Sequence, residues 1–359
     1  MRAQIPTREE VKALEAAGLV TVRPHAYLPL VIVNYTPKAQ YDRVWTPALL
    51  QCRGLVYNAD WRLVARGLPK FFNYEEHLGE NPVAGPLPSG PFEVTEKYDG
   101  SLGIVFRYGG EIVVATRGSF HSDQAREGYR ILLDQYGLDV LVRLLDDEHT
   151  HLFEIIYPEN RIVVDYGGIR ALRWLTTIHT ASGAEPGLWS FKWGGGDSRH
   201  SSNIQQFLGQ ERKNAEGYVL RFQGGQRVKI KHAEYVRLHA IVTGLSTVSV
   251  WEHLSAGGTL STMPELPDEL MAWARKVANA IMLEVLDLRE AVKERHMDIE
   301  HRIGSDATRK AFAAEVMQLD ADLRPLLFLT YDRREKELTQ HIWKLVKPAY
   351  ERPITADVC

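Results

Sequence analysis

The sequence has only two cysteines, Cys52 and Cys359, which lie far apart. This scarcity excludes a disulfide framework and a zinc site built from several cysteines, and it favours a reducing cytoplasmic location. No run approaches the roughly 18 uninterrupted apolar residues of a membrane span. The N-terminus also lacks a charged segment followed by an apolar one. We therefore expect neither membrane insertion nor export.

No sign of charge dominates, because 43 lysines and arginines are balanced by 46 aspartates and glutamates, for a formal net charge of −3. This balance excludes a histone-like polycation, so any nucleic-acid site must be local. The P-loop pattern G-x-x-x-x-G-K-[ST] is absent as well, which excludes a kinase module of that type. Hydrophobic residues at 45% and charged residues at 25% are instead typical of a folded globular protein.

The first part of the chain has the texture of strands and turns. From about residue 28 to 241, short runs of Val, Ile, Phe and Tyr are separated by Gly and Pro. Gly109-Gly110 and Gly224-Gly225 each lie between two such runs, which predicts antiparallel hairpins. Helix-capping residues, Thr7 with Glu10 and later Ser122, predict two helices among the strands. We expect an α+β domain with antiparallel sheets over 1–244.

The second part of the chain is patterned as helices. Apolar residues recur at intervals of three and four from Leu270 to Val292, and again over 312–319 and 338–345. Pro325 and Pro348 are expected to mark helix boundaries. We therefore predict an all-helical C-terminal domain over 245–359.

Residues 96–101 read EKYDGS and place Lys97 in a K-x-D-G arrangement just before a predicted strand. Alone, this could be a polar turn before a hairpin. The second hairpin begins after Glu216 and ends in VKIK, so Lys229 and Lys231 project from the same face of one strand. A solvated strand face is the simple interpretation of that pair; a bound phosphate over two ammonium groups is the functional one.

Further charged residues accompany these motifs. Glu154 interrupts a strongly apolar strand, while Arg53, Lys70 and Arg117 each occur next to a predicted strand or turn. Such a set suits phosphoryl or nucleotidyl transfer, with Lys97 as the candidate nucleophile and the cations stabilising charge on phosphate. We expect the neighbouring cations to lower the pKa of Lys97. Glu154 and Glu216 could hold a hydrated Mg²⁺.

The order of these motifs resembles the lysine nucleotidyltransferase superfamily of ligases and RNA capping enzymes, and within it the phage-type ATP-dependent RNA ligase 1 family, associated with tRNA repair. The matching segments are QCRG at 51–54, KFFN at 70–73, EKYDGSL at 96–102, RGSFHSDQA at 117–125, FEIIYPENRIVV at 153–164, EGYV at 216–219 and VKIKHAEYVRLH at 228–239. The resemblance implies an ATP-grasp-like ligase fold for the first domain. The helical second domain agrees with this family, whereas DNA ligases and capping enzymes carry an OB-fold there.

The resemblance also implies a reaction. Lys97 would attack the α-phosphate of ATP, release pyrophosphate and carry AMP, which would pass to an RNA 5′-phosphate before a 3′-hydroxyl displaces it. ATP with Mg²⁺, or Mn²⁺ in its place, would be the cofactors.

The site residues that the resemblance implies form one set. Lys97, Glu216, Lys229 and Lys231 would be catalytic, Glu154 and Glu216 would serve the metal, and Arg53, Lys70, Glu96 and Arg117 would complete the ATP site. Arg53 and Glu154 would lie near the ribose, Lys70 near the outer phosphates, and Lys229 and Lys231 on the α-phosphate. At Arg117 the family usually has lysine, so the charge is kept but the contact geometry differs.

The partners implied are RNA with 5′-phosphate and 3′-hydroxyl ends, tRNA among the candidates, with tRNA selection a candidate role for the helical domain. A separate kinase and phosphatase would have to prepare those ends. Two alternatives remain open: another polynucleotide nucleotidyltransferase, of the DNA ligase or capping type, and a catalytically idle RNA-binding protein on a ligase scaffold. His149 and His151, near three acidic residues, could suggest a metal site, but we expect an exposed loop there.

Overall fold

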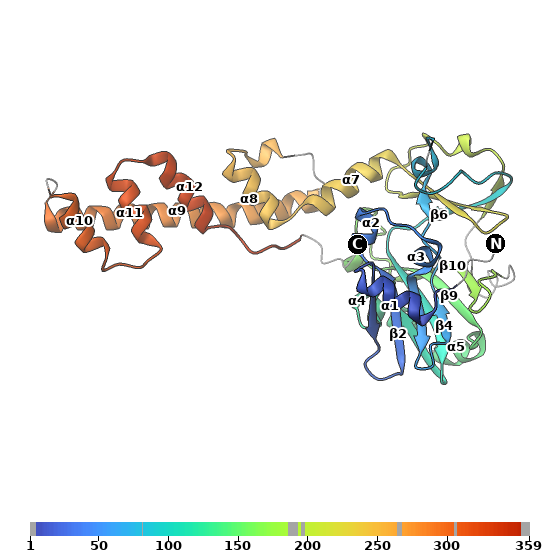
Figure 1. Ribbon diagram of the computed structural model, residues 1–359. Helices are drawn as coiled ribbons and strands as arrows, with labels where there is room; N and C mark the ends of the chain where they lie inside the picture. The colour runs from blue at the N-terminus through green and yellow to red at the C-terminus, as the bar shows by residue number, and fades with distance from the viewer. Residues whose placement is uncertain are drawn as a thin grey trace. The chain divides into compact units, whose positions relative to one another are not determined.

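The computed structural model describes residues 5–80, 82–185, 193–194, 198–263, 268–304 and 307–352 (Figure 1). The chain divides into two compact units, of which the first runs to Arg237 and the second begins at Leu238. The division falls inside one helix, α7 (Ala233–Gly244). The domain limits expected from the sequence, with a boundary after residue 244, stay a prediction.

The first unit is built on three sheets. Their strands are β1 (Val20–Pro24), β2 (Leu30–Tyr35), β3 (Arg53–Asn58), β4 (Leu63–Arg66), β5 (Phe72–Asn73), β6 (Phe92–Lys97), β7 (Ser101–Tyr108), β8 (Glu111–Ala115), β9 (His149–Ile156), β10 (Ala171–His179), β11 (Arg199–Ser201), β12 (Gly217–Phe222) and β13 (Arg227–Lys231). The sheets have the orders β1-β2-β3-β4, β10-β9-β7-β8 and β11-β6-β12-β13-β5. Among the described strands only the β13–β5 pair is parallel, so the predicted antiparallel α+β class is confirmed.

Helices cover the outer faces of this unit. They are α1 (Arg8–Ala16), α2 (Pro37–Tyr41), α3 (Pro47–Gln51), α4 (Asp123–Tyr136) and α5 (Leu138–Leu144). Thr7 and Glu10 form the predicted capping box at α1, and Ser122 caps α4. Both predicted hairpins are present, as β7–β8 and β12–β13.

The core of the first unit lies in layers. Apolar side chains of β2, β3, β7 and β9, such as Ile32, Val56, Phe106 and Leu152, form one buried cluster between two of the sheets. A second cluster lies between the β10-β9-β7-β8 sheet and helices α4 and α5. The five-stranded sheet has its own cluster around Phe92, which leaves the face of Lys97 free of that core.

The second unit is helical, as predicted. Its helices are α8 (Thr247–Ser255), α9 (Asp268–Ile303), α10 (Arg309–Val316), α11 (Leu323–Tyr331) and α12 (Glu335–Leu345). Pro325 lies in the first turn of α11 and so marks a helix boundary, as predicted; proline is tolerated there because the N–H it lacks has no helical partner. No helix in the described part of the chain is both long and apolar enough to cross a bilayer.

Candidate functional site

Three strands of the five-stranded sheet bring the predicted lysines together. Lys97 on β6 lies opposite Gly217 on β12, and Gly217 lies opposite Lys231 on β13. Since residues in register share a face of the sheet, Lys97 and Lys231 project to the same side. Lys229 lies two residues before Lys231 on β13 and therefore projects from the same face. The two lysines of the VKIK motif therefore lie on one face of the strand, as the sequence predicts.

Glu216, only 3% exposed, joins the two lysines. One carboxylate oxygen, Oε2, lies 2.7 Å from Lys97 Nζ, and the other, Oε1, lies 2.9 Å from Lys231 Nζ. Burial opposes ionisation of this carboxyl, but the charges of Lys97 and Lys231 and their hydrogen bonds hold the pKa of Glu216 below its usual value. Glu216 is thus a buried carboxylate compensated by two ammonium groups.

The expectation that neighbouring cations lower the pKa of Lys97 is wrong for this structure. Burial disfavours the ammonium form, but the nearby carboxylates of Glu216 and Glu154 outweigh it and raise the pKa of Lys97. Lys229 shows the opposite shift: burial and the charges of Lys70, Lys97 and Lys231 hold its pKa well below the ordinary value. The sequence could not show this because the partner of Lys97, Glu216, lies 119 residues away in the chain, just before β12.

Gly217 occupies a position in the sheet that has no room for a side chain. Its φ of +146° lies in a region that favours glycine, and a Cβ there would lie 2.0 Å from the carbonyl oxygen of Ile230 and 2.8 Å from Lys231 Cα. The absence of a side chain allows the backbones of β12 and β13 to pair closely at the register position that Gly217 shares with Lys97 and Lys231.

Glu154 of β9 is joined to the K-x-D-G turn through Gly100. The Gly100 amide donates a hydrogen bond of 3.0 Å to Glu154 Oε1, and a Cβ on Gly100 would lie 2.6 Å from the carbonyl oxygen of Ile155. The glycine of the motif therefore lets the turn lie against β9. Burial, followed by the charges of nearby carboxylates, raises the pKa of Glu154 from 4.5 to about 7 against the opposing effect of Lys97.

Asp99, the acidic residue of the K-x-D-G motif, is buried and fixes the turn. Its Oδ2 accepts hydrogen bonds of 2.8 Å from the amides of Val163 and Val164, and its Oδ1 accepts one of 2.7 Å from the hydroxyl of Tyr235. The backbone N–H of Asp99 donates to the Tyr166 hydroxyl at 2.8 Å. We did not single out Tyr166 or Tyr235 from the sequence. Tyr235 lies inside the matching VKIKHAEYVRLH segment, which is the signal that could have identified it.

The other predicted cations continue from Lys229 along aromatic side chains. Lys229 Nζ lies 5.4 Å from the centre of the Phe71 ring, and Lys70 Nζ lies 4.9 Å from that of Phe72. Burial, despite the opposing charge effects of Tyr35 and Glu76, lowers the pKa of Lys70.

Arg117 and Arg53 complete this group. The Arg117 guanidinium lies 5.3 Å from the ring centre of Tyr35 and donates to its hydroxyl at 3.4 Å. Arg53 donates to the Leu68 carbonyl at 3.4 Å, and burial lowers its pKa while Arg117 and Glu154 lie close enough to affect it. The structure therefore brings Arg53, Lys70 and Arg117 into one group.

Glu96 is not brought to this group. It follows Phe92 and Val94 at period two, so it projects from the opposite face of β6 to Lys97, where it forms an ion pair with Arg212. Its predicted part in ATP binding rests on resemblance alone and stays a prediction.

No group of three or more histidine, cysteine, aspartate or glutamate side chains suited to a metal ion occurs in the described part of the chain. The predicted role of Glu154 and Glu216 in holding a hydrated divalent cation stays a prediction; in this structure both carboxylate oxygens of Glu216 lie against lysine ammonium groups. Mg²⁺ accepts one or two such ligands and retains its remaining waters.

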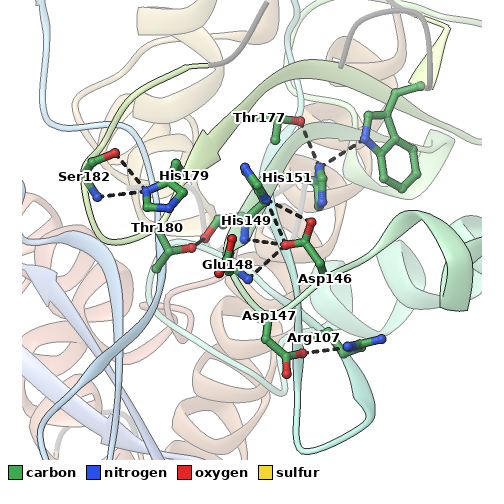
Figure 2. Close-up of polar contacts among 12 residues, drawn as sticks. Arg107, Asp146, Asp147, Glu148, His149, His151, Thr177, His179, Thr180 and Ser182 are labelled. Atoms are coloured by element: carbon green, nitrogen blue, oxygen red, sulfur yellow. Dashed lines mark hydrogen bonds and ion pairs between the residues drawn. The ribbon is translucent and has the colours of Figure 1, made fainter. Parts of the chain in front are cut away.

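The predicted exposed loop at His149 and His151 is wrong, as Figure 2 shows. Both residues lie in β9, and His151 is fully buried, 2.9 Å from Thr177 Oγ1 and 3.1 Å from the Trp193 indole nitrogen, which donates to it. His149 Nδ1 lies 2.8 Å from Asp146 Oδ1. The spacing of two residues between these histidines, which the sequence analysis interprets as part of a polar loop, is here the side-chain period of a β-strand.

Comparison with known proteins agrees with the motif order. Residues 51–186 match a protein-family model described as RNA ligase. The curated relatives include RNA ligase 1 of bacteriophage TS2126, 30% identical over 211 residues, which covers 54% of this chain and 52% of that protein. Another is a putative bifunctional polynucleotide kinase/RNA ligase of Autographa californica nuclear polyhedrosis virus, 28% identical over 190 residues, covering 46% and 26%.

The chain spans about half or less of the length of these curated relatives. Among solved structures, a putative ATP-dependent DNA ligase from Aquifex aeolicus is 12% identical with a TM-score of 0.44, covering 95% of this chain and 77% of that one. A Naegleria gruberi RNA ligase with ATP and Mn is 16% identical with a TM-score of 0.35, covering 42% and 51%. The family-model match over residues 51–186 includes Arg53, Lys97 and Glu154, so the resemblance to RNA ligases that the motifs indicate is confirmed over that segment.

Proposed function

We propose that this protein is an ATP-dependent RNA ligase that joins a 5′-phosphate to a 3′-hydroxyl through a lysyl-AMP intermediate on Lys97. The observation that carries the proposal is the pairing of Lys97 and Lys231 with the buried carboxylate of Glu216, beside a group of further cations. The K-x-D-G turn that carries Lys97 is in turn hydrogen-bonded to Glu154 through Gly100. A nucleophilic lysine, a buried carboxylate and a concentration of positive charge are what nucleotidyl transfer from a triphosphate requires.

In the first step, the Lys97 ammonium releases one proton to solvent, and the neutral Nζ forms a bond to the α-phosphorus of ATP while the bond to the pyrophosphate oxygen breaks. The nitrogen then loses a second proton to solvent as the phosphoramidate forms. The ion pair with Glu216 holds Lys97 as the ammonium, so binding of the substrate has to separate the pair before the nitrogen can react. Lys231, Lys229 and Lys70 then stabilise negative charge on the phosphates. Mg²⁺ held by Glu154 and Glu216 would supply further positive charge at these oxygens.

In the later steps, an RNA 5′-phosphate oxygen takes the AMP from Lys97, and the nitrogen recovers a proton. A 3′-hydroxyl oxygen then bonds to the 5′-phosphorus, loses its proton and releases AMP. The proposal also includes selection of tRNA, action in tRNA repair, a cytoplasmic location, and separate enzymes that prepare the RNA ends. The putative bifunctional kinase/ligase relative supports the association with end preparation.

The test is to incubate the protein with ATP and Mg²⁺ and measure its intact mass. We expect one added AMP on the wild type and on Lys12→Ala, a matched change of an exposed lysine in α1, and none on Lys97→Ala. Peptide mapping then locates the AMP, which distinguishes labelling of Lys97 from labelling of Lys229, the lysine whose pKa lies well below the ordinary value. No adduct on de-adenylylated wild type would refute the ligase and favour the idle scaffold.

Two further comparisons separate the remaining enzyme classes. GTP in place of ATP tests a capping-type reaction, which would label the protein with GMP. Matched RNA and DNA strands with 5′-phosphate and 3′-hydroxyl ends test the polymer, and sealing of DNA in preference to RNA would favour the DNA ligase alternative.

A further inference from the structure

The end of α2 and the residues after it present an exposed aromatic ring beside a cation that has no acidic partner in the described part of the chain. Tyr41 at the end of α2 is 84% exposed. The next residue, Asp42, forms an ion pair with Lys38, so these two charges compensate each other. Arg43 is exposed, has a φ of +52° and has no acidic partner within the described part of the chain. The surface therefore offers one flat ring and one available positive charge, two residues apart.

This segment adjoins the candidate site through Trp45. The Trp45 ring lies edge-on to Tyr35 at 5.2 Å between ring centres, and Lys70 Nζ lies 5.3 Å from the centre of the indole. Tyr35 in turn carries the Arg117 guanidinium on its ring. Because Trp45 follows Tyr41 by four positions, their Cα atoms are at most about 14 Å apart. The exposed segment therefore connects, through Trp45, to the cation group around Lys70.

The chemistry of the proposed reaction determines which RNA end arrives on this side. The cations extend from Lys97 and Lys231 through Lys229 to Lys70, so a triphosphate attacked by Lys97 extends toward Lys70. In an in-line displacement the leaving pyrophosphate departs opposite the attacking nitrogen. When AMP is later removed from Lys97, the incoming oxygen must again approach opposite that nitrogen, hence from the side of Lys70. That oxygen belongs to the RNA 5′-phosphate.

We propose that residues 41–45 bind the 5′-phosphorylated RNA strand, with Tyr41 stacking on a base near its 5′ end and Arg43 pairing with a backbone phosphate. This inference rests on the proposed ligase function. Stacking on an exposed aromatic ring and pairing of arginine with phosphate are the recurrent means by which proteins bind single-stranded nucleic acid. In the step served, the oxygen of the RNA 5′-phosphate forms a bond to the AMP phosphorus while the phosphorus–nitrogen bond breaks, and Lys97 takes up a proton from solvent.

A second exposed tyrosine provides the matched control. Tyr27 is 90% exposed in the turn between β1 and β2. That turn lies at the end of the sheet where Leu30 pairs with Asn58, whereas Arg53 pairs with Asn34 at the other end. Tyr27 is therefore as accessible as Tyr41 but is separated from the cation group by the length of β2.

The experiment measures binding of a short, labelled, 5′-phosphorylated single-stranded RNA by fluorescence anisotropy, together with lysyl-AMP formation by intact mass. We expect Tyr41→Ala to weaken RNA binding about 5- to 150-fold, the range given by loss of one stacked base, and Tyr41→Trp to retain it. Tyr27→Ala should bind as the wild type does, and all of these variants should form lysyl-AMP normally.

Arg43 is tested by the salt dependence of the same affinity. Arg43→Gln should reduce the slope of log affinity against log salt by about 0.7, the value for one phosphate contact on a single strand, while Arg62→Gln, a change of an exposed arginine in the β3–β4 turn, should leave it unchanged. Equal RNA affinity of the wild type, Tyr41→Ala and Tyr27→Ala, with lysyl-AMP still formed, overturns the inference and leaves the ligase proposal standing. Absence of lysyl-AMP on the wild type refutes the ligase instead.

Discussion

The raised pKa of Glu154 makes a measurable prediction about stability. A carboxyl whose pKa moves from 4.5 in the unfolded chain to about 7 in the folded protein binds more protons when folded over that interval. Stability therefore falls as the pH rises from about 4.5 to 7, and the full difference corresponds to about 3 kcal/mol. Below this window the group is protonated in both states and contributes no loss.

Glu154→Gln removes the titration while keeping an oxygen that can accept the hydrogen bond from the Gly100 amide. We expect the variant to lose less stability than the wild type between about pH 5 and pH 8, by about 1 to 3 kcal/mol in the urea unfolding free energy. Circular dichroism at pH 5 serves as the control that both proteins have the same fold.

The same ionisation can be followed directly. The infrared band of a protonated carboxyl should be present in the wild type at pH 5, absent from Glu154→Gln, and lost with a midpoint near pH 7. Identical pH dependence of unfolding in the two proteins, with no such band, would refute the reasoning that burial dominates the environment of Glu154.

Three further changes test separate features. Gly217→Ala should destabilise the protein by at least about 3 kcal/mol in chemical unfolding, because its Cβ meets backbone at 2.0 Å, whereas Gly225→Ala, with no atom within 4 Å of the new Cβ, should cost about 1 kcal/mol; equal losses would contradict the strain argument. Glu185→Gln, whose carboxylate pairs with an arginine only 9% exposed, should cost about 3 kcal/mol, against less than about 1 kcal/mol for Glu337→Gln in an exposed pair. Phe312→Ala should cost about 3 to 5 kcal/mol in the unfolding of the helical unit, since the ring is fully buried; a loss below 1 kcal/mol would show that the site collapses around the cavity.

Local signals in the sequence predicted the fold well where they depend on near neighbours. The capping box of Thr7 and Glu10 and the glycine pairs of the hairpins specify structure within a few residues, and both predictions are confirmed. The helix boundary predicted at Pro325 is confirmed as well, because this proline lies in the first turn of α11.

The composition of the site could be predicted from motif order, but its electrostatics could not. Which lysine is charged depends on contacts made across strands, such as that of Lys97 with Glu216, and no spacing in the chain encodes them. The buried state of His151 was missed for a similar reason, since its partners Thr177 and Trp193 come from distant segments.

Helix α7 determines how the two units could be separated or exchanged by genetic engineering. Its first turns carry Tyr235, whose hydroxyl fixes Asp99, while the second unit begins at Leu238 in the same helix. A truncation directly after Lys231 would remove this support from the K-x-D-G turn together with the helical unit, and loss of activity would then say nothing about that unit. A junction placed after Gly244 keeps the support intact, so chimaeras joined there would report on what the helical unit itself contributes.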